Sequence, residues 1–403
     1  MSKLVVPSST TAMRHRVSFT EGSTTHEVLT VDSMFAGAKE TVGIYLMASV
    51  ATSGNATGIA IVETANSHAV PLVEKAIAEE YRTTFDAVKW VVVTHAHLDH
   101  CAGAGQLMAR CPNATLLCHP RAKRHLIDPT ALLASAAKVY SKEQLQVQVG
   151  DMIPVDANRV RAVEDGEAIE LMPGRNVAFY HVLGHAKHHF ILHDVATSSV
   201  ISGDAFGSSA WTIGEPNIFY PATAPIDFDY AEAIKSIDKI LSLQPKHVWP
   251  THYASCEQPT KAAEQLKQQL AEYEAMRCKV SFLGQKGVDP QLLMPELMKG
   301  TRRSLESTFK KEGGTLSWHG FISGSMKINA QGLAVAAQRF PVDLDDLPEP
   351  LLDFSRRGIR PDDGPLDVAT VLAMEEKTQP LASMVLQEGL SGKQFTDRMG
   401  AKL

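Results

Sequence analysis

Several features are scarce or missing in this chain of 403 residues, and each absence narrows its function. No apolar run approaches the roughly 18 to 20 residues that a membrane-spanning helix needs. The residues after Met1 are rich in Ser and Thr and lack the apolar core of a secretory signal peptide. We therefore expect a soluble, intracellular protein without a membrane partner.

Cysteine pairs and clustered positive charge are also missing. The five cysteines are odd in number and contain no Cys-x-x-Cys pair, which favours reduced thiols over a disulfide framework or a structural zinc site. The net charge is -6 and no block of Lys and Arg occurs, which argues against a nucleic-acid partner. A small-molecule substrate is the expected partner, and the composition leaves the oligomeric state open.

The sequence does contain a run of β-branched residues that ends in a cluster of imidazoles. Residues 91–93 are typical of a buried strand, and His95, His97, Asp99 and His100 follow on one turn. Four such fixed positions arise by chance in roughly one sequence in a thousand or rarer. Neighbouring imidazoles repel one another when charged and cost desolvation energy when buried without partners. A divalent cation removes both penalties, so the cluster predicts a metal site.

Further metal-ligand side chains follow three predicted strands later in the chain. They are His185, Asp204 and His252, each just past the C-terminal end of its strand. Loops at strand ends are where sheet proteins gather functional residues. Together with the first cluster they make five histidines and two aspartates, which are enough ligands for two metal ions.

The predicted elements fall into two sets of strands with helices outside them. The first set lies within residues 14–63 and reads as an antiparallel-rich sheet, and the second lies within 160–202. A series of helices over 121–148, broken at Pro129, forms an insert between two metal-binding stretches and is a candidate cap over the site. Two sheets with helices outside are the simplest packing of this order, which indicates an α/β fold.

The chain changes character after residue 280. Helical segments are predicted up to residue 339, and prolines, aspartates and glycine then dominate 341–365, which is typical of a linker or a wrapped tail. We therefore divide the chain into a catalytic domain, a set of helices packed on it and an extension. Their bounds are 13–280, with the helical insert near 120–148, then 281–340 and 341–403.

In kind and order, the ligand residues resemble the signature of the metallo-β-lactamase superfamily. That signature is His-x-His-x-Asp-His followed by a lone His, a lone Asp and a lone His at strand ends. The resemblance implies an αββα sandwich of two mixed β-sheets flanked by helices, here with a C-terminal helical extension. It implies a first metal on His95, His97 and His185, a second on Asp99, His100 and His252, and Asp204 as the bridge between them.

His189 matches the second histidine of a Gly-His-x-x-x-His variant of the superfamily signature. We expect it to support a ligand rather than to bind a metal itself. The other histidines without an assigned position, His188 and His119 among them, are interpreted as core or surface residues.

Within the superfamily, the chain looks most similar to the glyoxalase II-like and lactonase-like hydrolases. Residues 116–121, 203–207 and 328–333 carry this likeness. Lactonases place a substrate-contacting tyrosine shortly after the bridging aspartate, where this chain has Phe206 and Gly207. Candidates to replace it are Tyr220 and Tyr253, and the sequence identifies no substrate-binding residue.

The resemblance implies a dinuclear metal-dependent hydrolase. Two cations that share a water lower its pKa toward neutrality and direct hydroxide at a thioester, a lactone or another carboxylic ester. Asp99 would hold the hydroxide and pass a proton to the leaving group, so it is the predicted catalytic residue. Zinc is the expected metal, although His and Asp ligands also suit iron or manganese.

Two alternatives share the scaffold. An iron-dependent redox enzyme like the persulfide dioxygenases needs fewer ligands, so the complete second ligand set argues against it. A phosphodiesterase or nuclease is disfavoured by the acidity of the chain.

The C-terminal tripeptide Ala401-Lys402-Leu403 resembles the Ser-Lys-Leu class of peroxisomal address. We therefore expect a cytoplasmic or a peroxisomal location.

Overall fold

The computed structural model describes residues 16–54, 56–137, 140–210, 218–253, 255–285, 287–313 and 320–342. The predicted extension over 341–403 lies outside these ranges except for its first two residues, and so does the C-terminal tripeptide. Within the described ranges, no helix is both long and apolar enough to cross a membrane. The chain forms two compact units. The first comprises residues up to 181 with 188–203 and 244–257, and the second comprises 182–187, 204–243 and the residues from 258 onward.

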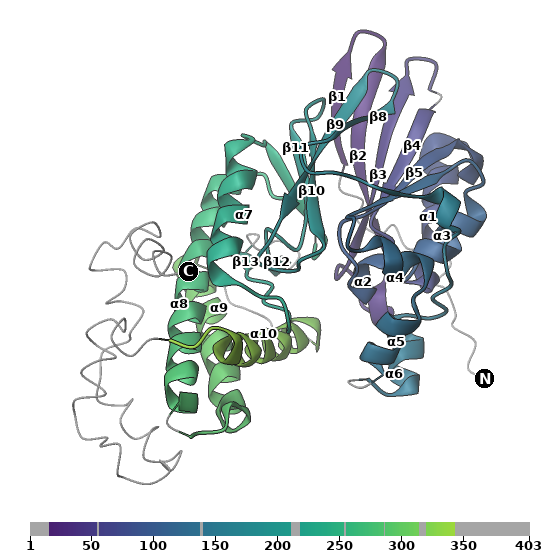
Figure 1. The fold of residues 1–403 in the computed structure, drawn as a ribbon. Helices are drawn as coiled ribbons and strands as arrows, with labels where there is room; N and C mark the ends of the chain where they lie inside the picture. The colour runs from purple at the N-terminus through teal and green to yellow at the C-terminus, as the bar shows by residue number, and fades with distance from the viewer. Residues whose placement is uncertain are drawn as a thin grey trace. The chain divides into compact units, whose positions relative to one another are not determined.

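The larger sheet of the first unit has seven strands in chain order (Figure 1). They are β1 (Arg16–Glu21), β2 (Thr24–Asp32), β3 (Gly43–Ala51), β4 (Ala56–Val62), β5 (Val88–Val93), β6 (Thr115–Cys118) and β7 (Val160–Ala162). Pairing is antiparallel from β1 to β4 and parallel from β4 to β7. The antiparallel part is the sheet predicted over 14–63, and β5 to β7 make the whole sheet mixed.

The second sheet has five strands in the order β14-β11-β10-β9-β8. They are β8 (Ala168–Met172), β9 (Arg175–Val182), β10 (His189–Asp194), β11 (Ser199–Gly203) and β14 (His247–Pro250). This sheet is also mixed, because β11 pairs antiparallel with β10 and parallel with β14. The two mixed sheets confirm the predicted α/β class.

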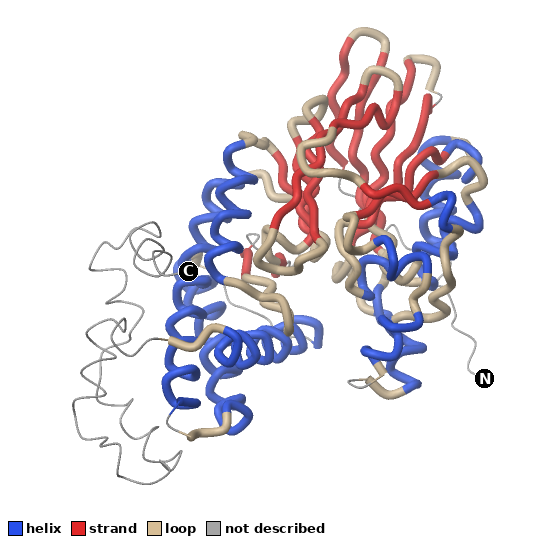
Figure 2. Tube along the Cα trace, in the orientation of Figure 1, coloured by secondary structure: helices blue, strands red, loops and turns tan. Residues whose placement is uncertain are grey.

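Side chains alternate between the two faces of the larger sheet. Tyr45 and Val92 face the second sheet and pack with Phe179 and other residues there, whereas their neighbours face the helices. Burial of each large apolar side chain stabilises the fold by roughly 1.5–3 kcal/mol. The helices of this unit are α1 (Val70–Tyr81), α2 (Leu98–Cys101), α3 (Ala104–Arg110), α4 (Lys123–Ile127), α5 (Thr130–Ala136) and α6 (Lys142–Gln148) (Figure 2).

The second unit contains a short hairpin and the C-terminal helices. Its elements are β12 (Ser208–Ala210), β13 (Ile218–Tyr220), α7 (Tyr230–Ser242), α8 (Pro259–Gln285), α9 (Met294–Lys311) and α10 (Gly320–Arg339). Helices α8, α9 and α10 pack against one another. Apolar side chains of β13, α9 and α10 form a shared cluster that includes Ile218, Phe309 and Met326. The helices predicted after residue 280 are therefore present as α9 and α10.

A buried ion pair links the two sheets of the first unit. Arg175 on β9 is fully buried and donates to the two carboxylate oxygens of Asp194 on β10 at 3.3 and 2.6 Å. Its Nη1 also donates to the backbone carbonyls of Glu27 on β2 and Ala48 on β3, at 3.1 and 2.6 Å. The guanidinium therefore holds both sheets through hydrogen bonds that the apolar core cannot supply.

We expect Asp194→Asn to destabilise the protein strongly. The substitution leaves the Arg175 charge buried without its counter-ion, which costs about 3–5 kcal/mol in comparable pairs. Urea unfolding followed by circular dichroism measures the loss. The matched control is Glu74→Gln, which breaks the pair between Glu74 and Arg110, both about half-exposed, and should cost at most about 1 kcal/mol. Equal losses in the two variants would contradict a structural role for the buried pair.

Candidate metal centre

The imidazole cluster of the first unit lies where β5 ends. His95 and His97 lie on the loop after Val93, and α2 then carries Asp99 and His100. His95 and His100 are fully buried, whereas Asp99 keeps one-third of its side chain exposed (33%). The buried strand thus delivers the predicted ligands to one short segment, as its sequence predicts.

Glu63, at the end of the neighbouring strand β4, accepts a hydrogen bond from the ring of the predicted ligand His100. It follows β4 directly and is fully buried, and its Oε1 accepts hydrogen bonds from the Thr94 and Thr251 hydroxyls and from His100 Nδ1, the last at 3.1 Å. Because Nδ1 of His100 donates to a carboxylate, its Nε2 is left to offer a lone pair. Nε2 lies 3.8 Å from Oδ1 of Asp99. Sequence analysis missed Glu63, although a charged residue at the end of an apolar strand is a signal for it.

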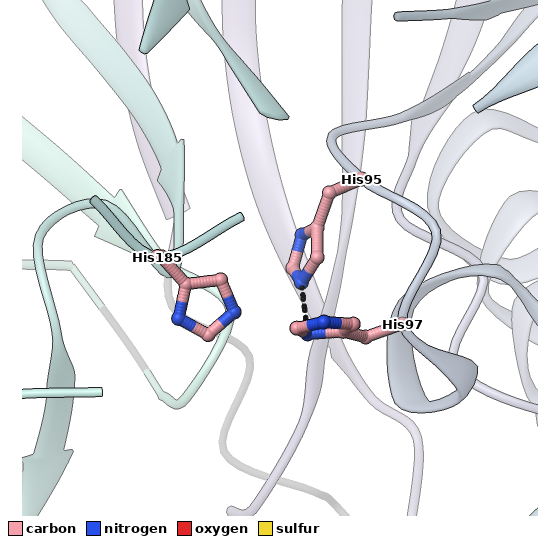
Figure 3. A group of neighbouring side chains, drawn as sticks. All are labelled: His95, His97 and His185. Atoms are coloured by element: carbon pink, nitrogen blue, oxygen red, sulfur yellow. Dashed lines mark hydrogen bonds between the residues drawn. The ribbon is translucent and has the colours of Figure 1, made fainter. Parts of the chain in front are cut away.

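His95 is oriented through the same carboxylate. Its Nδ1 lies 3.1 Å from the Thr94 hydroxyl, which donates its own proton to Glu63 and can therefore accept from the ring. Nε2 of His95 then carries the lone pair of the ring, and it lies 2.9 Å from Nδ1 of His97 (Figure 3). The two ring nitrogens therefore face each other.

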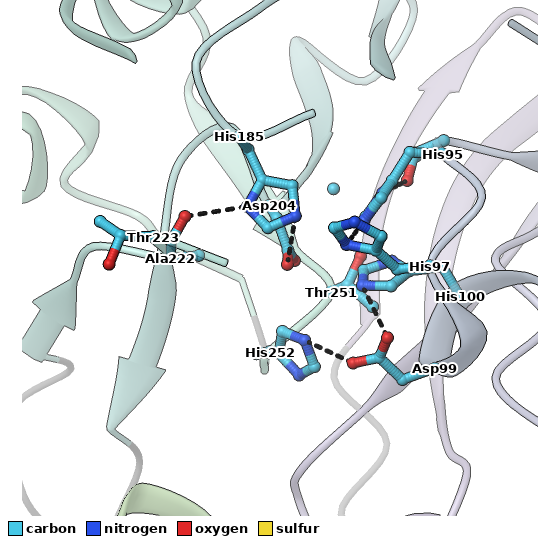
Figure 4. Close-up of polar contacts among 12 residues, drawn as sticks. His95, His97, Asp99, His100, His185, Asp204, Ala222, Thr223, Thr251 and His252 are labelled. Atoms are coloured by element: carbon cyan, nitrogen blue, oxygen red, sulfur yellow. Dashed lines mark hydrogen bonds and ion pairs between the residues drawn. The ribbon is translucent and has the colours of Figure 1, made fainter. Parts of the chain in front are cut away.

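His252 follows β14, and its ring nitrogens are placed like those of His100, with Nδ1 near an oxygen acceptor and Nε2 near Asp99. Its Nδ1 lies 2.8 Å from the backbone carbonyl of Thr41, and its Nε2 lies 3.3 Å from Oδ2 of Asp99 (Figure 4). Asp99, His100 and His252 each offer a ligand atom within 4.8 Å of the others. The first unit therefore brings together five of the seven predicted ligands.

His185 and Asp204 belong to the second unit and face each other there. Nδ1 of His185 lies 2.8 Å from the backbone carbonyl of Ala222, and Nε2 lies 3.3 Å from Oδ2 of Asp204 (Figure 4). Gly184 before His185 has a φ of +99°, and a Cβ there would lie 2.3 Å from the backbone nitrogen of Ala233. Only glycine fits this turn, which explains the Gly-His pair in the sequence.

This donor set fits a divalent cation. In both units, a histidine that gives its Nδ1 proton to a carbonyl turns the lone pair of Nε2 toward a carboxylate oxygen at 3.3 Å. Two lone pairs at this distance repel unless a positive charge stands between them or the ring is protonated. Imidazole nitrogens and carboxylate oxygens are ligands of zinc, iron and manganese, so the residues present suit such an ion.

Two further histidines lie against the ligand rings. His189 is buried and stacks on His95 with ring centroids 4.7 Å apart. His188, which sequence analysis left without a position, accepts a hydrogen bond from the backbone nitrogen of Ala96 at 3.2 Å and packs edge-on against His97. The role of His189 as a supporting residue stays a prediction.

The tyrosines considered as substrate contacts are both buried. Tyr220 lies in the apolar cluster of the second unit, and burial raises its pKa to about 12. Its hydroxyl lies 3.4 Å from that of Ser325 on α10. Burial also raises the pKa of Tyr253. At neutral pH both hydroxyls are therefore protonated.

His119 is a buried histidine of the first unit outside the ligand set. Burial, and then the nearby His181, His188 and Arg121, lower the pKa of His119 to about 4. Its Nδ1 accepts a hydrogen bond from the backbone nitrogen of Arg121 at 3.1 Å. The ring is neutral at pH 7, which agrees with its interpretation as a core histidine.

A pocket in the second unit adjoins His185 and Asp204. Its other lining residues are apolar or small: Leu183, Ala205, Gly207, Pro221, Ala222, Phe228, Ala233, Ile237, Leu266 and Leu270. No lysine or arginine belongs to this lining, as far as the described residues extend. Apolar walls lower the local dielectric constant and so strengthen the interaction of a cation with its ligands.

We expect Glu63→Gln to weaken metal binding by about 10–100-fold, as is usual when the hydrogen-bond partner of a ligand histidine is altered. The amide keeps the shape of the carboxylate but not its charge, so it holds the Nδ1 proton of His100 less firmly. Zinc affinity measured by competition with a chelator tests this.

The matched control is Glu27→Gln, which alters another buried carboxylate of the same unit, 3.2 Å from Arg16 Nε. This control should bind zinc as the unaltered chain does. Unchanged zinc affinity in Glu63→Gln would show that the carboxylate does not support the site.

Part of the chain is similar to a known family. Residues 84–252 match the family model described as the metallo-beta-lactamase superfamily. The chain is similar in structure to ST1585 from Sulfolobus tokodaii, an archaeal metallo-beta-lactamase superfamily protein. The two share 19% identity over 79% of this chain and 97% of that one, with a TM-score of 0.49.

Two further solved structures resemble the chain. For the metallo-beta-lactamase family protein TTHA1429 from Thermus thermophilus, the identity is 18% over 77% of this chain and 91% of that one, with a TM-score of 0.48. For the chemotaxis sensor ODP from T. denticola, it is 15% over 63% and 94%, with a TM-score of 0.42. The segment that matches the family model contains all the predicted ligands, from His95 to His252. Over residues 84–252, the chain is therefore similar to the metallo-β-lactamase superfamily.

Proposed function

We propose that this chain is a dinuclear metal-dependent hydrolase that cleaves a thioester, a lactone or another carboxylic ester. The observation that carries the proposal is the shared orientation of the ligand histidines. His100, His252 and His185 each direct Nδ1 to a fixed oxygen and present Nε2 to a carboxylate. Rings prepared in this way can hold a cation without reorganising when the cation binds.

The proposal assigns every predicted ligand. His95, His97 and His185 would hold a first ion, and Asp99, His100 and His252 would hold a second, with Asp204 as a ligand shared by both. Bound there, zinc ions would polarise a carbonyl oxygen and activate a water for attack. Iron or manganese suits the same donors, so elemental analysis decides the metal.

Asp99 is the residue proposed to move the proton. Its carboxylate lies between His100 and His252, at 3.8 and 3.3 Å from their Nε2 atoms, which fixes its position. It is also one-third exposed, so the proton it accepts from the attacking water can pass on to the leaving group or to solvent. The other predicted carboxylate, Asp204, is almost completely buried (7% exposed) and suits a purely structural place between ions.

The side chains that surround His185 and Asp204 in the second unit favour an uncharged ester over a phosphodiester. Recognition of a phosphate group depends on Arg, Lys or clustered backbone N–H groups, and no described lining residue of the pocket is a lysine or an arginine. A carbonyl compound with an apolar substituent needs no such partner. A small-molecule ester is therefore the proposed substrate class, with no nucleic-acid or membrane partner.

We expect Asp99→Asn to lower kcat by about 10²–10⁴-fold, because an amide keeps the shape but does not carry the proton. The measurement is turnover of the zinc-loaded chain on a panel of thioester, lactone and phosphodiester substrates. An exposed aspartate that pairs with Lys267 provides the control, Asp238→Asn, which should leave turnover unchanged. Full turnover in Asp99→Asn would exclude the proton-carrying role, and activity confined to phosphodiesters would overturn the proposed substrate class.

We expect Asp204→Ala to lose both ions, because a bridging carboxylate balances charge on each of them. Elemental analysis after gel filtration gives the metal content per chain. Asp227→Ala, which alters a carboxylate near Lys187, is the control and should keep its metal. A variant that retained two ions would remove Asp204 from the bridging position.

A further inference from the structure

One stretch of α10 lies apart from every predicted ligand and yet makes specific contacts in the second unit. It is residues 328–333, which carry part of the likeness to the lactonase-like hydrolases. Asn329 in this stretch is buried (3% exposed) although it is a polar residue of a helix. A buried amide is costly unless its hydrogen-bonding groups find partners, so its contacts are informative.

Asn329 binds the segment Pro221–Thr223 at three points. Its side-chain Oδ1 accepts a hydrogen bond from the backbone nitrogen of Thr223 at 2.9 Å, and its Nδ2 donates to the carbonyl of Pro221 at 2.7 Å. The Thr223 hydroxyl donates in turn to the backbone carbonyl of Asn329 at 3.1 Å. Both ends of the amide are therefore used, and the segment is held on each side of Ala222.

Gly332 allows the segment to approach the helix. It lies three residues after Asn329, and a Cβ at this position would stand 1.6 Å from the carbonyl oxygen of Thr223. No side chain is compatible with that contact. The three hydrogen bonds of Asn329 thus depend on a glycine at this distance along the helix.

Ala222, which lies between these contacts, orients the predicted metal ligand His185. The carbonyl of Ala222 accepts the hydrogen bond from Nδ1 of His185 at 2.8 Å, and Nε2 of the same ring lies 3.3 Å from Asp204 (Figure 4). A carbonyl that moved or rotated would release the Nδ1 proton and permit the other tautomer. The position of the Ala222 carbonyl therefore determines which nitrogen His185 offers.

We propose that Asn329 and Gly332 are positioning residues for His185. They fix the segment Pro221–Thr223, which fixes the tautomer and the orientation of the ring and so raises the affinity for the metal ion. This inference rests on the proposed role of His185 as a ligand. It gives α10 a part in the metal site although the helix supplies no ligand.

The test uses Asn329→Asp in the full chain. Aspartate keeps the acceptor for the Thr223 nitrogen but loses the donor and places a negative charge against the Pro221 carbonyl. We expect zinc affinity, measured by competition with a chelator, to fall by about 10–100-fold, the usual effect of altering the support of a ligand histidine. Gln331→Ala, on the same helix, is the control and should leave zinc affinity unchanged.

A double-mutant cycle separates positioning from a general loss of stability. In a His185→Ala background, Asn329→Asp should no longer change zinc affinity, because the ring on which it acts is gone. An equal loss in both backgrounds would show that Asn329 only stabilises the fold. Thermal unfolding of each metal-free variant verifies that binding is measured on folded protein.

The outcomes also distinguish this inference from the proposed hydrolase activity. Zinc binding that falls in Asn329→Asp supports the positioning role even if no ester is cleaved. Unchanged zinc binding in that variant overturns the positioning role and leaves the hydrolase proposal standing. A wild-type chain that binds no zinc contradicts the ligand assignment on which both rest.

Discussion

The constraint on which the candidate site depends is the commitment of one ring nitrogen to a fixed oxygen in three of its histidines, His100, His252 and His185. An imidazole that gives its Nδ1 proton away has only Nε2 left to bind a cation. His100 gives this proton to Glu63, whereas His252 and His185 give theirs to backbone carbonyls. The scaffold must therefore hold these oxygens as firmly as the ligands, and the packing of each unit serves that requirement.

The two units meet this requirement by different means. In the first unit, a fully buried carboxylate collects donors from three segments, and three hydrogen bonds to Oε1 of Glu63 offset the cost of burying its charge. In the second unit, the neutral side-chain amide of Asn329 on α10 holds the loop around Ala222. The backbone carbonyl of Ala222 then accepts the Nδ1 proton of His185. The carboxylate of Glu63 accepts from residues that follow two strands, Thr94 after β5 and Thr251 after β14, and from His100 on α2, whereas the loop that supports His185 is held by contacts on both sides of Ala222.

Strand ends, ligand types and the two sheets could be predicted from the sequence because each depends on local patterns of apolar and polar residues. The residues that hold the ligands in place could not be predicted in this way, because they come from distant parts of the chain. Glu63 lies 37 residues before His100, and Asn329 lies 106 residues after Thr223. The acceptor for His252 is a backbone carbonyl, and every residue has one, so no side chain marks Thr41 as special. Such contacts follow only from the register of packed elements.

The difference between the two predicted carboxylate ligands argues for a division of labour. A carboxylate that shares charge between ions works best when it is rigid and shielded from water, since shielding strengthens its interaction with them. A carboxylate that carries a proton must exchange it, which requires access to substrate and solvent. Asp204 is 7% exposed and Asp99 is 33% exposed, so each meets one requirement and not the other. The exposed fractions of the two side chains therefore agree with the different roles proposed for them.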